Sequence, residues 1–302
     1  MIAISVKKDR VNFLSAFRSG REIEVNDFGV IQLKSNTFNS QVISQILNRR
    51  KIRKSPVISK KCMIFIDSSE VILNQIRTGE KVDSDTLVQW NNDLMFNDTC
   101  LDRYNDLHYQ TCKDANILSV YIEKSKQSHY YSSCKKIDLN LSCLSINIFS
   151  AEYLAREVFD AKSDGNYAIW GIGAQKDNLM IVHDNQFVGL ITFKRSKKDM
   201  EIVDFIGPEK YLLDCIDKIN TNNFSELKSA NLINKVYAYQ KSLKTDIKKI
   251  IKKNKDSIEI LNPLLKIPSF KKRRNEDIKS SFLAEMGYIF KMVESSGVEE
   301  NA

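Results

Sequence analysis

Several features that define common enzyme and membrane classes are scarce or absent in this sequence. Only 10 glycines and 4 prolines occur in 302 residues, which argues against long flexible linkers. No apolar run of about 18 residues is present, so no transmembrane helix is expected. The N-terminal MIAISVKKDR has too short an apolar run for a signal peptide. The motifs G-x-x-x-x-G-K-[ST], G-x-G-x-x-G, G-x-S-x-G and H-E-x-x-H are all missing, so the corresponding nucleotide, hydrolase and zinc-protease classes are disfavoured.

Metal-binding and disulfide patterns are also missing. The six cysteines include no C-x-x-C pair, and the three histidines are scattered along the chain. Structural zinc sites use closely spaced ligand pairs, so we expect reduced thiols and no metal site. The cysteines are Cys62, Cys100, Cys112, Cys134, Cys143 and Cys215.

Positive charge, in contrast, is concentrated in one segment. The net charge is +8, but Lys235–Arg274 alone holds thirteen basic and three acidic residues, so it carries +10 and the remainder −2. Within it, SLKTDIKKIIKKNK (242–255) predicts a helix with an apolar face and a basic patch, formed by Lys244, Lys248, Lys249, Lys252 and Lys253. Three interpretations stay open: a solvated helix face, a surface for an anionic membrane or an acidic partner, and a nucleic-acid surface.

Two segments predict the same order of strands and turns. In the first, Ile2–Val6, Val11–Phe17 and Glu22–Leu33 are extended and separated by tight turns. In the second, Tyr167–Trp170 is followed by a glycine loop at Gly171–Ala174, and then by further strands at Asn178–Val182 and Phe187–Phe193. Helices and additional strands follow each triplet. We therefore predict an α/β protein of two related halves, the plan of the actin-like fold with its two RNase H-like halves.

Several segments resemble the type IV pilus assembly protein PilM family, which is related to the cell-division protein FtsA. CMIFIDSSEVILNQIR is similar to a strand pair of that family, and ILSVYIEK…LSCLSINIFSAEYLARE is similar to the βαβ unit and exit helix of its inserted subdomain. IEILNPLLKI resembles the family's N-P strand end, and FLAEMGYIFKM its closing helix. The resemblance covers most of the chain in the family's order.

The resemblance implies a division of the chain. Residues 1–80 and 278–293 are expected to form the first actin-like half, with the helix at Ser280–Val293 returning to it. Residues 81–150 would form an inserted small α/β subdomain of the FtsA/PilM type, containing a βαβ unit. Residues 151–270 would form the second half, and 294–302 a disordered tail.

The nucleotide-binding elements of that family are altered in this sequence. The fold holds phosphates with two loops that each begin Asp-hydrophobic-Gly, in which the Asp organises Mg²⁺. Ser5 stands at the first Asp and Lys7 at its glycine, while Gly171 stands at the second Asp. The loop Gly171, Gly173 and Ala174 is therefore predicted to be a vestigial nucleotide loop. The adenine-packing turn falls at Tyr237–Ser242, which contains no glycine.

The function implied by the resemblance is a non-catalytic, cytoplasmic scaffold at the inner membrane. It would bind the cytoplasmic tail of a PilN-like membrane protein, together with other pilus or secretion platform proteins, and use no cofactor. The alternative is an active ATPase with Mg-ATP, in which Lys7, Lys8 and Arg10 hold phosphate by charge or Asp9 and Asp177 replace the lost acids. A degenerate secretion-system relative such as GspL and a DNA-binding protein are further alternatives. His129-Tyr130-Tyr131 are candidates for the partner groove.

Overall fold

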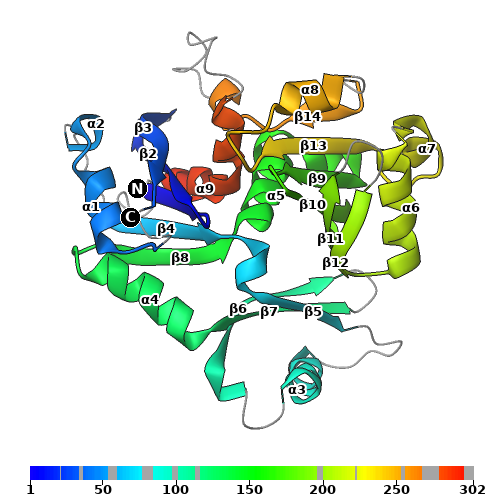
Figure 1. Cartoon of the computed structure of the whole chain (residues 1–302), viewed down its shortest axis with the longest axis horizontal. Helices are drawn as coiled ribbons and strands as arrows, with labels where there is room; N and C mark the ends of the chain where they lie inside the picture. The colour runs from blue at the N-terminus through cyan, green and yellow to red at the C-terminus, as the bar shows by residue number, and fades with distance from the viewer. Residues whose placement is uncertain are drawn as a thin grey trace.

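Three β-sheets organise the chain in the computed structural model, which describes residues 1–20, 22–33, 37–53, 60–76, 84–96, 101–112, 116–195, 200–221, 223–252, 256–266 and 279–295. Two large sheets lie side by side, and a small third sheet lies below them (Figure 1).

The first large sheet has the strand order β3-β2-β1-β4-β8. β1 runs antiparallel to β2 and parallel to β4, and β8 runs parallel to β4. β2 and β3 are joined by a tight turn at Gly20, whose φ of +62° favours glycine. The strands are β1 (Ile2–Val6), β2 (Arg10–Ser19), β3 (Glu22–Gln32), β4 (Lys61–Ile66) and β8 (Asn140–Ile146).

The second large sheet repeats this arrangement, with one additional edge strand. Its order is β12-β11-β10-β9-β13-β14, and β9 is antiparallel to β10 and parallel to β13, as β1 is to β2 and β4. The strands are β9 (Tyr167–Ile172), β10 (Lys176–His183), β11 (Gln186–Arg195), β12 (Met200–Ile206), β13 (Lys235–Gln240) and β14 (Ile258–Ile260). The predicted repeat of two related halves is therefore confirmed.

The small sheet, with the order β5-β7-β6, belongs to a segment inserted between β4 and β8. Its strands are β5 (Ile72–Ile76), β6 (Tyr104–Cys112) and β7 (Asn116–Glu123), and α3 (Ser84–Met95) follows β5 in the chain. The predicted βαβ unit is wrong, because β7 lies in the small sheet whereas β8 pairs with β4 of the first sheet. The boundaries 81–150 need the same correction: the insertion begins at β5, and β8 returns to the first half.

The helices cover the sheets and fill the space between them. Figure 1 shows α5 between the two large sheets, α1 and α4 beside the first, α6 and α7 beside the second and α8 near β14. None of the described helices has the length and apolar character needed to cross a bilayer. The α-helices are α1 (Ser40–Leu47), α2 (Arg50–Arg53), α4 (Lys124–Lys135), α5 (Asn147–Val158), α6 (Glu209–Asn220), α7 (Phe224–Ser229), α8 (Ile247–Ile251) and α9 (Tyr288–Ser295).

The closing segment differs from the single helix predicted for Ser280–Val293. It begins as a 3-10 helix, η9 (Lys279–Met286), breaks at Gly287 and continues as α9. A Cβ at Gly287 would lie 2.4 Å from Cβ of Leu154 and 2.7 Å from the Ser150 carbonyl oxygen, so the close approach to α5 requires glycine. The segment packs against β1, β2, β13 and α5, and so joins the two halves. Two residues of the predicted tail, Glu294 and Ser295, are helical, and the rest of it lies outside the described residues.

Three apolar clusters form the core. One lies between the two large sheets and combines residues of β1, β2, β9 and β10 with residues of α5, η9 and α9. The second lies between the first sheet and α1 and α4, and the third between the second sheet and α6 and α8. Because its residues belong to the cluster between the sheets, η9 contributes to the packing of the two halves against each other.

Candidate functional site

The crevice between the halves brings together all three nucleotide elements expected from the sequence. The β1–β2 turn, the β9–β10 loop and the end of β13 meet there. Arg10 of the first element donates from Nη2 to the Lys241 carbonyl at 3.2 Å, and the Lys241 N–H donates to the Ile172 carbonyl at 2.8 Å. The three segments that the family comparison placed at a nucleotide site are therefore neighbours in the structure, and what they can bind depends on their side chains.

In the first half, a buried ion pair occupies the place of the phosphate loop. Lys7 donates from Nζ to Glu285 Oε1 at 2.6 Å, and the Glu285 side chain is fully buried. Ser5 donates from Oγ to Glu285 Oε2 at 2.6 Å and lies 3.0 Å from Asn147 Oδ1. Burial lowers the pKa of Lys7, and the neighbouring Glu285 opposes that shift. The closing segment η9 thus supplies a carboxylate that the first half lacks, and the carboxylate faces a lysine.

In the second half, the loop predicted to be a vestigial nucleotide loop contacts a carboxylate of this chain. The Gly173 N–H donates to Asp177 Oδ1 at 2.9 Å, and Trp170 donates from Nε1 to Asp177 Oδ2 at 2.9 Å. Arg195 forms an ion pair with the same carboxylate through Nε, and donates from Nη2 to the Gly173 carbonyl at 3.1 Å. Arg195 Nη2 also donates to Asp177 Oδ1 at 3.3 Å, so four donors hold this carboxylate and one of them is the loop N–H that could otherwise bind an anion.

The two glycines of this loop have packing roles. A Cβ at Gly171 would lie 2.7 Å from the Tyr239 hydroxyl oxygen and 2.9 Å from Cδ of Lys241. A Cβ at Gly173 would lie 2.1 Å from the Lys176 carbonyl oxygen. The position of the missing acid, Gly171, is thus filled by side chains of β13 and of the residue that follows it. Gly171 and Ile172 belong to β9 rather than to the predicted loop, and Ala174 is exposed in the turn.

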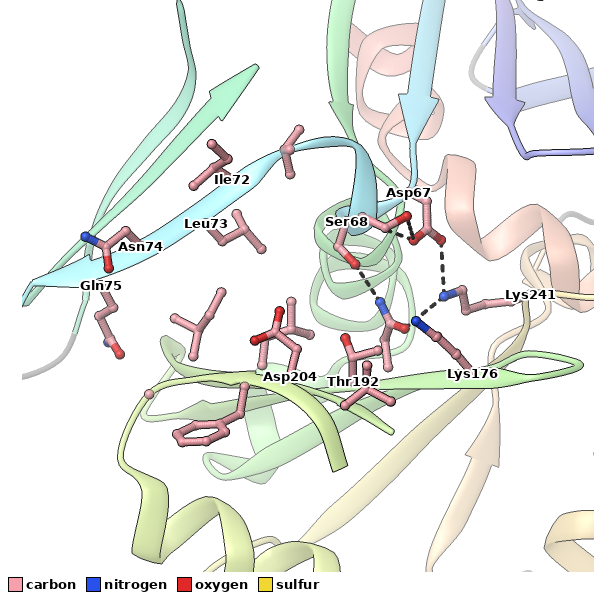
Figure 2. Close-up of a pocket in the computed structure, with 18 residues that line it drawn as sticks. Asp67, Ser68, Ile72, Leu73, Asn74, Gln75, Lys176, Thr192, Asp204 and Lys241 are labelled. Atoms are coloured by element: carbon pink, nitrogen blue, oxygen red, sulfur yellow. Dashed lines mark hydrogen bonds and ion pairs between the residues drawn. The ribbon is translucent and has the colours of Figure 1, made fainter. Parts of the chain in front are cut away.

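A chain of polar contacts crosses the crevice at Lys241. Its Nζ lies 3.1 Å from Asp67 Oδ2 and donates to Asn178 Oδ1 at 2.9 Å, while Asn178 donates to Ser68 Oγ at 2.7 Å (Figure 2). Burial alone would raise the pKa of Asp67, but Lys241, Lys7 and the Ser69 N–H lower it well below its usual range. Asp67 and Ser68 follow β4 of the first half, so these contacts connect the two halves.

Beside this chain of contacts lies a groove of about 620 Å³, which we call the β5–β12 groove. One wall is β5 of the insertion, and the other is formed by β11 and β12 of the second sheet. Figure 2 shows Thr192 and Asp204 facing Leu73 across it. Lys176 lies at its inner end, is exposed and forms no ion pair with any described residue.

The displaced acids proposed from the sequence are engaged elsewhere. Asp9 is half exposed and lies 3.2 Å from Nη1 of Arg10, and Asp177 is the loop carboxylate described above. No group of three or more potential metal-ligating side chains of His, Cys, Asp or Glu occurs among the described residues. The residues present therefore offer no described carboxylate cluster for Mg²⁺.

The other residues singled out in the sequence lie away from the crevice. Lys244, Lys248, Lys249 and Lys252 are exposed, and Lys253 lies outside the described residues. Within the described part of the predicted helix Ser242–Asn254, the α-helical residues are those of α8, and a turn precedes them. Of the His129-Tyr130-Tyr131 candidates, Tyr130 is buried, His129 Nε2 lies 2.6 Å from the Phe38 carbonyl and Tyr131 is exposed.

Four residues of the crevice were missed as site residues by sequence reasoning: Asp67, Arg195, Lys241 and Glu285. Asp67 carried a local signal, because it directly follows the buried strand CMIFI. Lys241 lies in the segment Tyr237–Ser242 that the family comparison placed at the adenine turn, whereas Arg195 and Glu285 reach the crevice only through tertiary packing.

No sequence-family model and no curated protein matches the chain. Among solved structures, it resembles the PilM-PilN type IV pilus biogenesis complex with a TM-score of 0.63 and 10% identity, over 97% of this chain and 98% of that chain. A Bacteroides thetaiotaomicron protein with an actin-like ATPase fold has a TM-score of 0.44 at 9% identity, over 87% and 90% of the two chains. For the cytoplasmic domain of EpsL, an inner-membrane component of the Vibrio cholerae type II secretion system, the values are 0.43 and 10%, over 79% and 81%. The strand order of both halves and the first of these similarities establish that the chain has the actin-like fold.

Proposed function

We propose that the protein is an actin-like scaffold that does not turn over nucleotide and that binds the tail of a membrane protein. The observation that carries the first part is the hydrogen bond from the Gly173 N–H to Asp177. A phosphate at this loop would have to displace a buried carboxylate that is also paired with Arg195. Separating such a pair costs about 3 kcal/mol or more.

The charge in the crevice supports the same proposal. Glu285, Asp67 and Asp177 each pair with a nearby cation of this chain, so Lys7, Lys241 and Arg195 are already neutralised and are not free to hold a triphosphate. A bound triphosphate would also lie near these three carboxylates, and like charges held a few ångströms apart in a partly dry site repel strongly. Under the alternative of an active ATPase, Lys7 is one of the proposed phosphate ligands, but its Nζ donates to Glu285.

Calorimetry with Mg-ATP and Mg-ADP tests this part. We expect no binding heat up to millimolar nucleotide, and no ATP hydrolysis above the rate in buffer. An active actin-like ATPase measured in parallel is the positive control. Micromolar affinity for either nucleotide would overturn the proposal and favour the alternative of an active ATPase.

The second part concerns the partner. The solved structure with the TM-score of 0.63 is a complex of PilM with PilN, which suggests a membrane protein of the PilN type as the partner of this chain. We propose that an extended cytoplasmic tail of such a protein binds in the β5–β12 groove. The protein would then lie at the cytoplasmic face of the inner membrane, in a pilus or secretion platform.

The groove suits an extended peptide because an edge strand borders it on each side. β5 ends the small sheet and β12 ends the second large sheet, so each has an edge without a paired strand among the described residues. An added strand would gain main-chain hydrogen bonds at such an edge. Between the edges, Leu73, Leu190 and Ile206 offer apolar contact, and Thr192 and Asp204 offer polar contact.

A synthetic tail peptide tests the groove. The probe is a synthetic peptide of the cytoplasmic segment of a PilN-type membrane protein, labelled for fluorescence anisotropy. We expect Thr192→Arg, which places a bulky cation in the groove, to weaken binding at least tenfold. Ser125→Arg, at an exposed position on α4, is the matched control and should leave binding within twofold. Equal binding by both variants would exclude the groove.

A further inference from the structure

A second surface, on the opposite edge of the second half, combines exposed lysines with exposed leucines. α8 packs Ile247 and Ile251 into the core, which leaves Lys248 and Lys249 pointing outward. Lys252 follows the helix and Lys244 precedes it, and both are exposed. We call these four residues and their apolar neighbours the α8 surface.

The lysines of the α8 surface are not neutralised within the described part of the chain. None of the ion pairs formed by the described residues includes any of the four. The acid closest to them in sequence, Asp246, accepts a hydrogen bond from the Lys249 backbone N–H at 3.2 Å and caps α8. Ion pairing within this part of the fold therefore leaves the positive charge available for a partner.

Apolar groups lie beside these charges. Leu243 is 37% exposed and Leu265 is 45% exposed, so both leucines can contact a partner at this surface. A groove of about 880 Å³ runs past α8 and is lined by Phe159, Ile251 and Leu265 together with Lys248 and Lys266. The acidic residues of this groove do not cancel its positive charge. Glu259 is paired with Lys235 at 2.6 Å, and Asp256 is a single exposed acid.

We propose that the α8 surface binds directly to an anionic phospholipid bilayer. Lysines attract the negative leaflet, and each contributes roughly fivefold in partitioning, while leucines enter the interfacial region. The positive charge of the protein is concentrated in the segment that contains this surface, because Lys235–Arg274 carries +10 and the remainder of the chain −2. Nucleic acid fits less well, since none of the described residues on this surface is an exposed aromatic that could stack on bases.

The position of the surface is compatible with a partner in the β5–β12 groove, although it does not depend on one. α8 lies near β14, and β14 and β12 are at opposite edges of the second sheet (Figure 1). Contact of the α8 surface with a bilayer would therefore leave the groove open.

Vesicle flotation tests the proposal. The probes are vesicles of phosphatidylcholine alone and vesicles in which about a third of the lipid is phosphatidylglycerol. We expect the protein to float with the anionic vesicles at low salt, to release them as salt is raised, and not to float with the neutral vesicles. Failure to float with anionic vesicles at low salt would overturn the proposal.

Two triple variants with the same change in net charge locate the surface. K248E/K249E/K252E should reduce partitioning into anionic vesicles at least tenfold. K124E/K135E/K136E reverses three exposed lysines in and directly after α4 and should remain within twofold of the unmodified protein. Circular dichroism checks that both fold. Equal losses in the two variants would show an effect of net charge without a specific site. A gel shift of duplex DNA that the first variant abolishes, while flotation persists, would indicate nucleic acid as the ligand. Either result contradicts the proposal.

Discussion

The Gly173 N–H donates to the Asp177 carboxylate at 2.9 Å, so the loop of the second half is closed by the strand that follows it. Backbone N–H groups of a glycine turn are suited to an anion, and here the anion belongs to the protein. Arg195 from β11 completes the contact by pairing with the same carboxylate. This loop is therefore held by contacts within the second half itself.

The Arg195–Asp177 pair is expected to contribute strongly to stability. Arg195→Ala would leave a carboxylate that is 1% exposed without its cation, so the free energy of unfolding should fall by about 3 kcal/mol. Urea unfolding followed by circular dichroism measures this. The adjacent Lys194 is the matched control, because its pair with Glu201 is exposed and Lys194→Ala should cost about 0.5 kcal/mol or less. Similar losses for both variants would contradict a special role of the buried pair.

Placing an acid at position 171 should not create nucleotide binding. Any side chain there meets the Tyr239 hydroxyl and Lys241, so Gly171→Ala should destabilise the protein by about 1–3 kcal/mol, and Gly171→Asp by more. Thermal unfolding compares the two with the unmodified protein, and calorimetry with Mg-ATP is run on each. A Gly171→Asp variant that is fully stable and binds Mg-ATP would show that the crevice can reopen.

The sequence was sufficient to predict the repeated halves. Turn residues at Lys7–Arg10 and Asp184-Asn185 separate β-rich segments and predict hairpins. The antiparallel pairs β1–β2 and β10–β11 confirm this prediction. The error at β7 and β8 arose because a strand, a helix and a second strand in succession look the same whether or not the strands share a sheet. Only the pairing of β8 with β4 decides this, and that contact spans about eighty residues of chain.

The site was less predictable, for a related reason. The loss of the acids at Ser5 and Gly171 could be read from the motif. Their replacement could not, because Glu285 reaches Ser5 across 280 positions of sequence. A carboxylate in a closing segment carries no local signal that distinguishes it from an exposed one.

Stability should also depend on pH through Asp67. Its pKa is lower in the folded protein than the ordinary value of 3.8, so the unfolded chain binds more protons in the window below that value. The contribution is therefore fully present above pH 3.8 and is lost as the pH falls through the folded pKa. Asp67→Asn should unfold more easily at neutral pH, and its difference from the unmodified protein should shrink on acidification. A difference that stays constant from pH 7 to pH 3 would contradict this.

Glu152 provides a control with the opposite sign. Burial raises its pKa above the ordinary 4.5, and Arg156 and the Tyr167 hydroxyl only partly oppose the shift. Its contribution is present at low pH and is lost as the pH rises through the folded pKa. Stability relative to Glu152→Gln should therefore decrease as pH rises above 4.5, whereas stability relative to Asp67→Asn increases as pH rises toward 3.8 and is constant above it.

The pair of Lys7 with Glu285 should couple the closing segment to β1. Lys7→Met leaves a fully buried carboxylate without its cation and should cost about 3 kcal/mol, whereas Lys7→Met combined with Glu285→Gln should cost less than the sum of the single changes. A double-mutant cycle in urea measures the coupling, for which we expect more than about 1 kcal/mol. The same cycle on the exposed pair, with Lys60→Met and Asp138→Asn, should give a coupling energy of about 0.5 kcal/mol or less. Equal coupling energies for the two pairs would mean that η9 is held to the first half by apolar packing alone.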